Sequence, residues 1–185
     1  MFENLKEDIR TNGGYKGQKK FFEILWLYAT KPQLWAITEY RFRRWADTCI
    51  FNIPLLGFFL FIPYRCIVSN LIFILTSMEI SVGTEIGPGI DIAHCGGQVV
   101  VAKKIGRNCF FGQGITIGSG KGGYPEIGDR VVMHAGCRIF GGIRIGDNVI
   151  IGANSVVHRD VPSNVVVGGI PAVIIKKNDV SMPGE

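Results

Sequence analysis

The segment that decides the fold runs from Ile80 to Ile174, and it repeats one dipeptide, Ile-Gly. The copies are Ile86-Gly87, Ile105-Gly106, Ile117-Gly118, Ile127-Gly128, Ile145-Gly146 and Ile151-Gly152. Divided into units of six, the segment has an apolar residue at each leading position: Ile80, Ile86, Ile92, Ile105, Phe111, Ile117, Ile127, Met133, Ile139, Ile145, Ile151 and Val157. The position that follows is mostly glycine or another small residue.

This six-residue period predicts a parallel β-helix. Each unit forms a short strand and a turn, and three units close one triangular coil. The aliphatic side chain points inward and stacks on its counterpart about 4.8 Å away in the next coil. Glycine or another small residue permits the tight corner. An ordinary β-sandwich is disfavoured, because its turn signals recur about every 8–12 residues.

Two insertions interrupt the repeat. One extra residue falls near 94–97 (HCGG), between the units at Ile92 and Ile105. Four extra residues belong to the loop 118–125 (GSGKGGYP). Insertions in repeat proteins form loops, and they often mark the binding face. The sequence therefore directs the search for chemistry to a turn that holds a histidine and to a glycine-rich loop that holds a lysine.

Composition narrows the function classes. The chain has 185 residues, 47% of them hydrophobic, and a formal net charge of +5. Its basic residues form no long run, which disfavours nucleic acid and fits an anionic cofactor or a membrane surface better. The five cysteines form no C-x-x-C pair, and His94-Cys95 has no partner at ligand spacing, so we expect free thiols and no metal site. The first ten residues form no apolar leader, which favours a cytoplasmic location.

The first part of the chain has a helical pattern. We expect helices over 2–10, 18–30 and 32–49, separated by Asn12-Gly13-Gly14 and by Lys31-Pro32. The third helix has an apolar stripe on one face and Arg41, Arg43 and Arg44 on the other. After the coils, a closing strand is expected over 165–175. The expected organisation is a helical region at 1–76, a β-helix at 77–177 and a flexible tail at 178–185.

The stretch 50–64 (IFNIPLLGFFLFIPY) is strongly apolar. A membrane-spanning helix needs about 20 apolar residues, and this stretch is shorter and is interrupted by Pro54, Gly57 and Pro63. Two interpretations stay open. The stretch packs under the open end of the solenoid or against neighbouring subunits, or it makes peripheral contact with the inner face of a membrane, helped by the nearby arginines.

Several motifs carry a family resemblance. They are 78–80 (MEI), 86–89 (IGPG), His94 with Gly96-Gly97, 116–121 (TIGSGK) and 165–172 (VVVGGIPA). Through them, residues 78–177 resemble the left-handed β-helix acyltransferases, and within these the serine acetyltransferase family. The resemblance implies left-handed coils, transfer of an acetyl group from acetyl-CoA to a hydroxyl, and a homotrimer whose sites lie between two subunits. Two such trimers could pair through the helices.

The resemblance also implies the catalytic groups. His94 matches the family's general base, and Glu79 matches its carboxylate partner, which is usually Asp. A hydroxyl is a poor nucleophile, so a base must take its proton as it attacks the thioester. Imidazole titrates in the right range, and a carboxylate on its other nitrogen fixes the tautomer. Of the other histidines, we expect His134 at a surface corner rather than in the cofactor groove, and His158 in solvent.

The cofactor positions follow from the same resemblance. Ser119, Gly120, Ala135 and Ala153 match residues along which the pantetheine arm of acetyl-CoA runs, and small residues there let backbone amides approach it. The phosphates need cations, and charged pairs with phosphate are the stronger hydrogen bonds. The candidates for these phosphate contacts are Lys121, Lys176 and Lys177.

Departures from the family bear on the acceptor. Ala93 stands where the serine enzymes have Asp, and the shortened loop 118–125 lacks their Arg and His. An amino acid buried without charge partners would lose its hydration uncompensated. We therefore predict a sugar hydroxyl of surface polysaccharide synthesis as acceptor, with Tyr124 and Asp91 as contacts. L-serine remains the alternative, since Asp91 could take over the ammonium, and a non-catalytic scaffold is a remote third interpretation.

Overall fold

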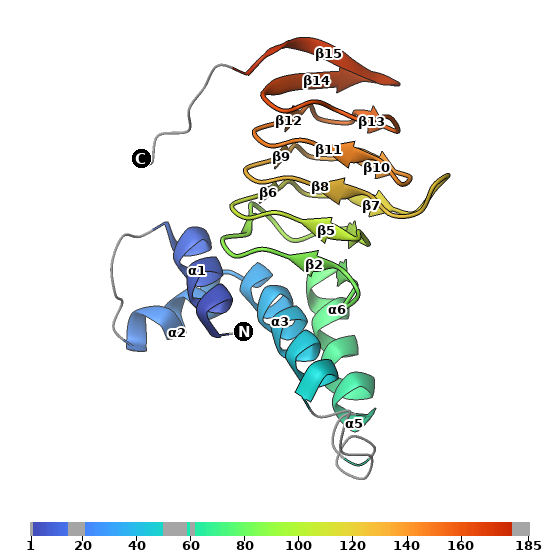
Figure 1. Cartoon of the computed structure of the whole chain (residues 1–185). Helices are drawn as coiled ribbons and strands as arrows, with labels where there is room; N and C mark the ends of the chain where they lie inside the picture. The colour runs from blue at the N-terminus through green and yellow to red at the C-terminus, as the bar shows by residue number, and fades with distance from the viewer. Residues whose placement is uncertain (1, 15–20, 50–58, 60–61, 179–185) are drawn as a thin grey trace.

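The structure is a computed structural model that describes residues 2–14, 21–49, 59 and 62–178. A group of helices stands at one end of a triangular solenoid, and the chain climbs the solenoid coil by coil toward its C-terminal end (Figure 1). The expected class, a left-handed parallel β-helix with an N-terminal helical region, is confirmed by the three parallel sheets described below and by the structural relatives described with the site.

Each sheet takes one strand from each coil it spans. The first sheet has the order β1 (Met78–Ile80), β4 (Gln98–Val100), β7 (Thr116–Gly118), β10 (Arg138–Phe140) and β13 (Val156–Val157). The second has the order β2 (Glu85–Ile86), β5 (Lys104–Ile105), β8 (Glu126–Ile127) and β11 (Arg144–Ile145). The third has the order β3 (Asp91–Ile92), β6 (Phe110–Phe111), β9 (Val132–Met133), β12 (Ile150–Ile151), β14 (Val165–Gly169) and β15 (Ala172–Lys177).

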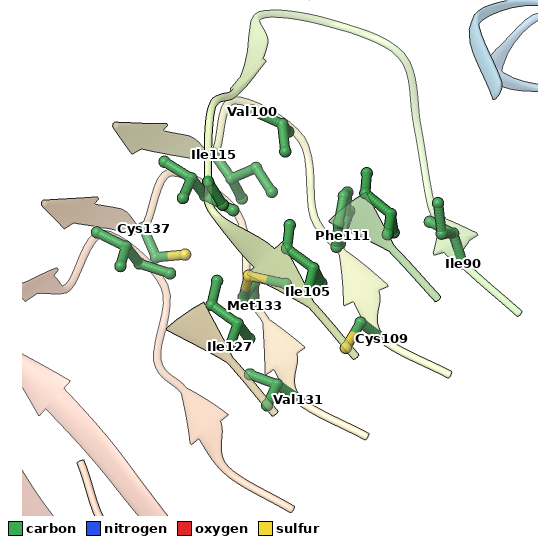
Figure 2. Packing of buried hydrophobic residues seen from close by; sticks show 14 of the residues in the cluster. Ile90, Val100, Ile105, Cys109, Phe111, Ile115, Ile127, Val131, Met133 and Cys137 are labelled. Atoms are coloured by element: carbon green, nitrogen blue, oxygen red, sulfur yellow. The ribbon is translucent and has the colours of Figure 1, made fainter. Parts of the chain in front are cut away.

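The repeat positions form the core. In the first sheet, one inward column consists of Ile80, Val100, Ile117, Ile139 and Val157, in direct register. In the third sheet, Ile92, Phe111, Met133 and Ile151 form the matching column. Figure 2 shows such side chains filling the interior of the coils. The leading positions of the repeat therefore supply one buried column in each sheet. A second set of buried residues, two positions before the leading ones, completes the core and was not expected from the sequence: Ile90, Cys109, Ile115, Val131, Cys137 and Val149.

The structure corrects the position of the first insertion. Ile92 pairs with Phe111 and Val100 pairs with Ile117, so the turn from Ile92 to Val100 is two residues longer than the turn one coil above. The next corner, from Val100 to Ile105, is one residue shorter than the matching corner from Ile139 to Ile145. The sequence count of one extra residue was the net of these two changes, and the histidine turn is longer than expected.

A second correction concerns the end of the solenoid. The expected closing strand over 165–175 is an antiparallel hairpin of β14 and β15, which turns at Ile170-Pro171. A glycine at position 169 with a φ of 104° allows the sharp reversal. Lys176 and Lys177 lie on β15, opposite Val166 and Val165, so they belong to the sheet. Beyond Asn178, the tail lies outside the described residues.

The helices largely follow the sequence pattern. They are α1 (Phe2–Gly13), α2 (Phe21–Thr30), α3 (Gln33–Cys49), α5 (Ile62–Tyr64), the π-helical turn η2 (Arg65–Ser69) and α6 (Asn70–Thr76). Helix α1 runs past its expected end at residue 10, because the Asn12 side chain bonds back to Asp8 O and also to the first coil. The start of the second helix at 18–20, and most of the stretch 50–64, lie outside the described residues.

The arginines of α3 face the solenoid. Arg41 donates hydrogen bonds to Ile86 O and Gly87 O, at 2.6 Å each. Arg43 donates to Ile80 O at 2.8 Å. Arg44 donates to Val82 O and Thr84 O. The three guanidinium groups donate to backbone carbonyls of the first coil. No further coil lies below it to donate hydrogen bonds to these carbonyls. The expectation that they assist membrane contact is therefore wrong for these three side chains.

A buried ion pair fastens the helices to the coil. Arg41 Nε lies 2.9 Å from Asp8 Oδ2, and both side chains are buried. Asp8 Oδ1 also accepts hydrogen bonds from Gly89 N and Ile90 N. Burial raises the pKa of Asp8, and the Arg41 guanidinium opposes that rise. Three elements, α1, α3 and the turn before β3, are thus joined at one carboxylate.

Apolar side chains remain exposed on the helices that follow α3. They are Ile62, Ile67, Val68, Leu71, Phe73, Ile74 and Leu75. A helical segment that is apolar on most sides is normally covered by protein or lipid. None of the helices that the structure describes has the length and continuous hydropathy needed to span a bilayer.

Candidate functional site

His94 lies on the long turn between the third and first sheets. Strand β3 ends at Ile92, and the chain leaves the regular coil until β4 begins at Gln98. Gly96 and Gly97 have φ values of 133° and 70°, which a residue with a side chain rarely adopts. The His94 side chain is exposed. The extra length of the turn therefore carries the imidazole outward, away from the core.

A buried amide closes this turn from inside. Gln98 Nε2 donates to His94 O at 2.5 Å, and Gln98 Oε1 accepts from Gly96 N at 2.9 Å. The Gln98 side chain is fully buried. Sequence analysis missed Gln98, although a signal was present: counted six residues on from Ile92, it stands where the repeat would have an aliphatic residue. In the structure Val100 takes the leading position, and Gln98 lies two residues earlier, in the buried column of Met78.

Two helix side chains hold β3 from the other side. Asn12 Nδ2 donates to Ile90 O at 2.6 Å, and Asn12 Oδ1 accepts from Ile92 N at 3.1 Å. Gln33 Nε2 donates to Ile92 O at 3.3 Å. The first strand of a stack lacks a neighbour on one edge, and these amides stand in for its missing backbone partners. This support was also not expected from the sequence.

Glu79 and His94 are not joined by a hydrogen bond in the part of the chain that the structure describes. Glu79 is exposed on β1, opposite Val99, and within the described residues it forms no hydrogen bond or ion pair with His94. It borders a hollow of about 270 Å³ between α3, α6 and β1, which Arg43 also lines. Catalytic hydrogen bonds are often long before substrate binds. The pairing of Glu79 with His94 therefore stays a prediction.

The glycine-rich loop forms a second, separate feature. Gly120 and Gly123 exchange backbone hydrogen bonds of 3.0 and 3.1 Å, with Lys121 exposed at the tip between them. Gly142 N donates to Lys121 O at 3.0 Å. A Cβ on Gly142 would collide with the Gly122 backbone, so the close contact requires glycine. Figure 1 shows this loop projecting from the solenoid after β7.

A groove of about 590 Å³ lies beside this loop. Tyr124, half exposed, forms part of its wall, and Val101 and Arg144 form others. Across it, Lys103 Nζ lies 2.6 Å from Glu126 Oε1. The groove has an aromatic face and charged rims, which are the features that bind a polar ring or chain.

The predicted site residues occupy two opposite edges of the first sheet. His94, Ala135 and Ala153 lie where the chain passes from the third sheet into the first, in the first, third and fourth of these turns. Ser119, Gly120, Lys121 and Tyr124 lie where the chain leaves the first sheet for the second. Lys176 and Lys177 are exposed on β15, at the far end of the third sheet. Within one chain, the predicted cofactor residues therefore do not converge on His94.

Two further residues singled out in the sequence belong to the third sheet or directly follow one of its strands. Asp91 is half-buried on β3, and burial raises the pKa of its carboxyl while Lys31 opposes that rise. His134 is exposed one coil above the turn that follows β6, and its ring meets Phe110 edge-on at 6.2 Å. Among the described residues, no group of three or more His, Cys, Asp or Glu side chains is placed to hold a metal ion.

Comparison with known proteins identifies relatives. No family model matches the chain. A serine acetyltransferase of Synechococcus elongatus is 43% identical over 120 residues, which are 62% of this chain and 49% of that protein. A serine acetyltransferase of Staphylococcus aureus is 44% identical over 112 residues, 57% of this chain and 52% of that protein. The chain thus spans about half the length of the curated relatives it matches.

Solved structures extend the likeness to nearly the whole chain. Neisseria gonorrhoeae serine acetyltransferase in complex with serine has a TM-score of 0.72 and 27% identity, covering 93% of this chain and 68% of that one. Brucella abortus serine acetyltransferase in complex with coenzyme A has a TM-score of 0.73 and 27% identity, covering 95% and 68%.

The solenoid and its helical region therefore have the fold of the hexapeptide-repeat acyltransferases. Within that class, the chain is a homologue of the serine acetyltransferases.

Proposed function

We propose that the chain is an O-acetyltransferase that moves an acetyl group from acetyl-CoA to a hydroxyl, with His94 as general base. The observation that carries the proposal is the exposed imidazole of His94 on a turn that a buried amide supports. The relatives of the chain by sequence and by fold are serine acetyltransferases. A remote alternative, a non-catalytic scaffold, gives no reason for a buried amide dedicated to that turn.

The proposed reaction needs one proton to be transferred from the acceptor hydroxyl to the sulfur of CoA. The acceptor oxygen attacks the thioester carbonyl while His94 takes the hydroxyl proton, which forms a tetrahedral intermediate. The intermediate collapses and expels the CoA thiolate, and the imidazolium returns the proton to that sulfur. Glu79 would hold the second ring nitrogen and stabilise the imidazolium. This role needs a shift of Glu79 or His94 from the present arrangement, because the two are not bonded.

L-serine is the acceptor that the relatives favour. The matched proteins are serine acetyltransferases, and one of the related structures holds serine. This ranking reverses the order expected from the sequence, where a sugar came first and serine second. Half-buried Asp91 is the available carboxylate near His94 that could receive an ammonium group. Burial raises the pKa of this carboxyl, and a bound ammonium group would oppose that rise by favouring the charged form.

A sugar hydroxyl remains as a second candidate because of one observation. Ala93 and the loop 118–125 supply no arginine or histidine for a carboxylate, and Lys121 is the loop's one cation. The groove at Tyr124 offers an aromatic wall instead. These features fit a neutral ring of a surface polysaccharide, bound by stacking and hydrogen bonds.

Acceptor kinetics test the proposal. The purified protein is supplied with acetyl-CoA, and CoA release is measured with L-serine and with neutral sugars and oligosaccharides in parallel. We expect saturable release with L-serine, with kcat/KM in the ordinary enzyme range of about 10⁴ M⁻¹s⁻¹ or more. Release only with sugars would transfer the proposal to the second candidate. Release with no hydroxyl compound would reject acetyl transfer.

Cofactor binding and assembly are parts of the same proposal. Ser119, Gly120, Ala135 and Ala153 would line the pantetheine arm, and Lys121, Lys176 and Lys177 would meet the phosphates. Since the two edges of the first sheet are apart within one chain, a complete site would form when a second subunit covers the sheet. We expect a homotrimer, with two trimers pairing through the helices as an option. Light scattering that gives a monomer with full activity would contradict this.

A membrane contact also remains a proposal. The exposed apolar side chains from Ile62 to Leu75 are available for lipid or for another subunit. The arginines of α3 no longer support the lipid alternative. Co-sedimentation of the protein with anionic vesicles tests it, and a trimer that binds no vesicles would favour subunit contact.

A further inference from the structure

We propose that Gln98 is a positioning residue for His94. Its side-chain amide fixes the geometry of the turn that carries the imidazole, although it touches no reacting atom. The inference rests on the proposed role of His94 as base. Gln98 occupies a buried position where the repeat would ordinarily have an apolar residue. The inference therefore concerns a feature of this chain's own sequence.

The surroundings of Gln98 are those of a core residue. It lies opposite Met78 of β1, and the backbone next to it bonds to Ile115 in the coil above. Cys137 occupies the same column one coil further on. Met78, Ile115 and Cys137 are buried, as Gln98 is. An unpaired amide at such a position would cost roughly 1–3 kcal/mol, so its bonding partners should explain its presence.

Both ends of the amide bond to the histidine turn. The Gly96 N–H can only donate, so it must face the amide oxygen of Gln98, and this fixes the orientation of the whole group. The nitrogen then points at His94 O, 2.5 Å away. A longer contact of 3.4 Å reaches Gly112 O in the coil above. The amide therefore bonds to the turn and to the rigid coil next to it.

The turn needs this support because of its length. It is two residues longer than the turn one coil above, and Gly96 and Gly97 both have positive φ. Glycine can adopt many conformations, so a turn with two glycines is intrinsically loose. Backbone bonds from Gly97 N to Ser77 O and from Gly114 N to Gly96 O fasten its far end. The amide of Gln98 fastens the His94 end.

The central experiment replaces Gln98 by methionine. Gln98→Met keeps the length and volume of the side chain and removes both hydrogen bonds to the turn, together with the longer one to Gly112 O. We expect kcat to fall by about 10- to 100-fold, the cost of misplacing a catalytic group by a fraction of an ångström to an ångström, while KM for acetyl-CoA is unchanged. The assay uses the full chain and whichever acceptor the wild-type protein accepts.

A second variant separates positioning from stability. In Gln98→Glu, a protonated carboxyl could still donate to His94 O and accept from Gly96 N, whereas a carboxylate cannot donate. Burial should raise the pKa of that carboxyl. We expect its activity relative to wild type to lie close to one at the acid end of the profile and to fall as pH rises. A ratio that is low and flat across the profile would overturn the proposal.

The matched control is Thr84→Val. Thr84 is fully buried between β1 and β2, in the coil that ends with the His94 turn. Its Oγ1 accepts a hydrogen bond from Ala102 N at 3.0 Å. Like Gln98→Met, this variant removes buried side-chain bonding to the backbone, here a single bond, and it does so away from the His94 turn. We expect a comparable loss in unfolding temperature with kcat unchanged. If Gln98→Met and Thr84→Val lose activity only in proportion to stability, Gln98 has no positioning role.

His94→Ala distinguishes the failure of the two proposals. If that variant keeps near-normal turnover, His94 is not the base and the proposed mechanism fails. If it is inactive while Gln98→Met has full kcat, the mechanism stands and the positioning role of Gln98 is wrong.

Discussion

The two insertions in the repeat are held against the regular coils in different ways. The His94 turn leaves the coil between the third and first sheets, and a buried side chain, Gln98, ties it from inside. The loop 118–125 leaves at the opposite edge of the first sheet, and backbone contacts among Gly120, Gly123 and Gly142 hold it. The difference indicates that the turn fixes one side chain, whereas the loop presents several.

The physical cause lies in what each insertion contains. Hydrogen bonds from a buried amide are shielded from water and set the direction of the groups they join. Backbone pairing between glycines fixes the path of the loop but leaves the side chains of Lys121 and Tyr124 exposed on its surface. A base needs a fixed position to act on one proton, and side chains that bind an acceptor or a phosphate tolerate adjustment.

The largest effect that this comparison predicts comes from His94→Ala. We expect turnover to fall by about 10²–10⁴-fold, the range typical of losing a general base, with the solenoid intact by circular dichroism. Glu79→Gln should cost less, because the imidazole remains. The matched control is His158→Ala, an exposed histidine just after β13, which should retain full turnover. Equal activity in all three variants would remove the turn from the mechanism.

The next effect concerns the backbone packing of the loop. In Gly142→Ala the new methyl group collides with the Gly122 backbone, so one of the two segments must move. Overpacking of this kind costs about 1–3 kcal/mol, and we expect a lower unfolding temperature by calorimetry. Gly83→Ala is the control, since a Cβ there meets only Ser81 Oγ at an ordinary 3.6 Å. Equal unfolding temperatures would show that the loop adapts freely.

Sequence alone predicted the solenoid because its cause is local and periodic. Each aliphatic residue of the repeat finds the same environment one coil later, so Ile117, Ile139 and their counterparts were assigned to the core without knowledge of the chain path. The helices α1 to α3 followed from stop signals in the same way.

The polar contacts could not be predicted, because they join distant parts of the chain. Asn12 bonds to strand β3 nearly eighty residues later, and Asp8 bonds to Gly89. No period in the sequence announces such pairs. Gln98 is the instructive exception: a polar residue at an aliphatic phase was visible in the sequence, but its meaning depended on the two extra residues of the turn.

A smaller effect is expected for the exposed lysines. Replacing Lys121, Lys176 and Lys177 by glutamine together should raise KM for acetyl-CoA by up to roughly tenfold, because exposed charge pairs are worth about 0.2–1 kcal/mol each. Added salt should weaken acetyl-CoA binding to the wild-type protein and affect the triple variant less. Isothermal titration calorimetry at two salt concentrations measures the affinity of the wild-type protein and of the triple variant for acetyl-CoA. An unchanged affinity would remove these lysines from the cofactor site.

The smallest effect is a difference in thiol reactivity between the two insertions. Cys95 lies in the His94 turn, half-buried, and burial raises the pKa of its thiol. Burial raises the pKa of Cys109 and Cys137 to about 12. A raised pKa lowers the thiolate fraction at a given pH, so alkylation is slower than that of an ordinary thiol. The alkylation rate also keeps increasing with pH above the range in which an ordinary thiol is already fully ionised.

Iodoacetamide labelling between about pH 7 and pH 9, read by peptide mass spectrometry, tests this difference. Exposed Cys49 and Cys66 should react first, Cys95 later, and Cys109 and Cys137 only after unfolding. A thiol introduced by Ser119→Cys at the exposed base of the glycine loop should react faster than Cys95, because that loop leaves its side chains in solvent. Gln98→Met should speed the labelling of Cys95 and leave the rate at position 119 unchanged. If Cys95 reacts as fast as the introduced thiol in the wild-type background, the His94 turn is as loose as the loop, and the contrast between the two insertions is lost.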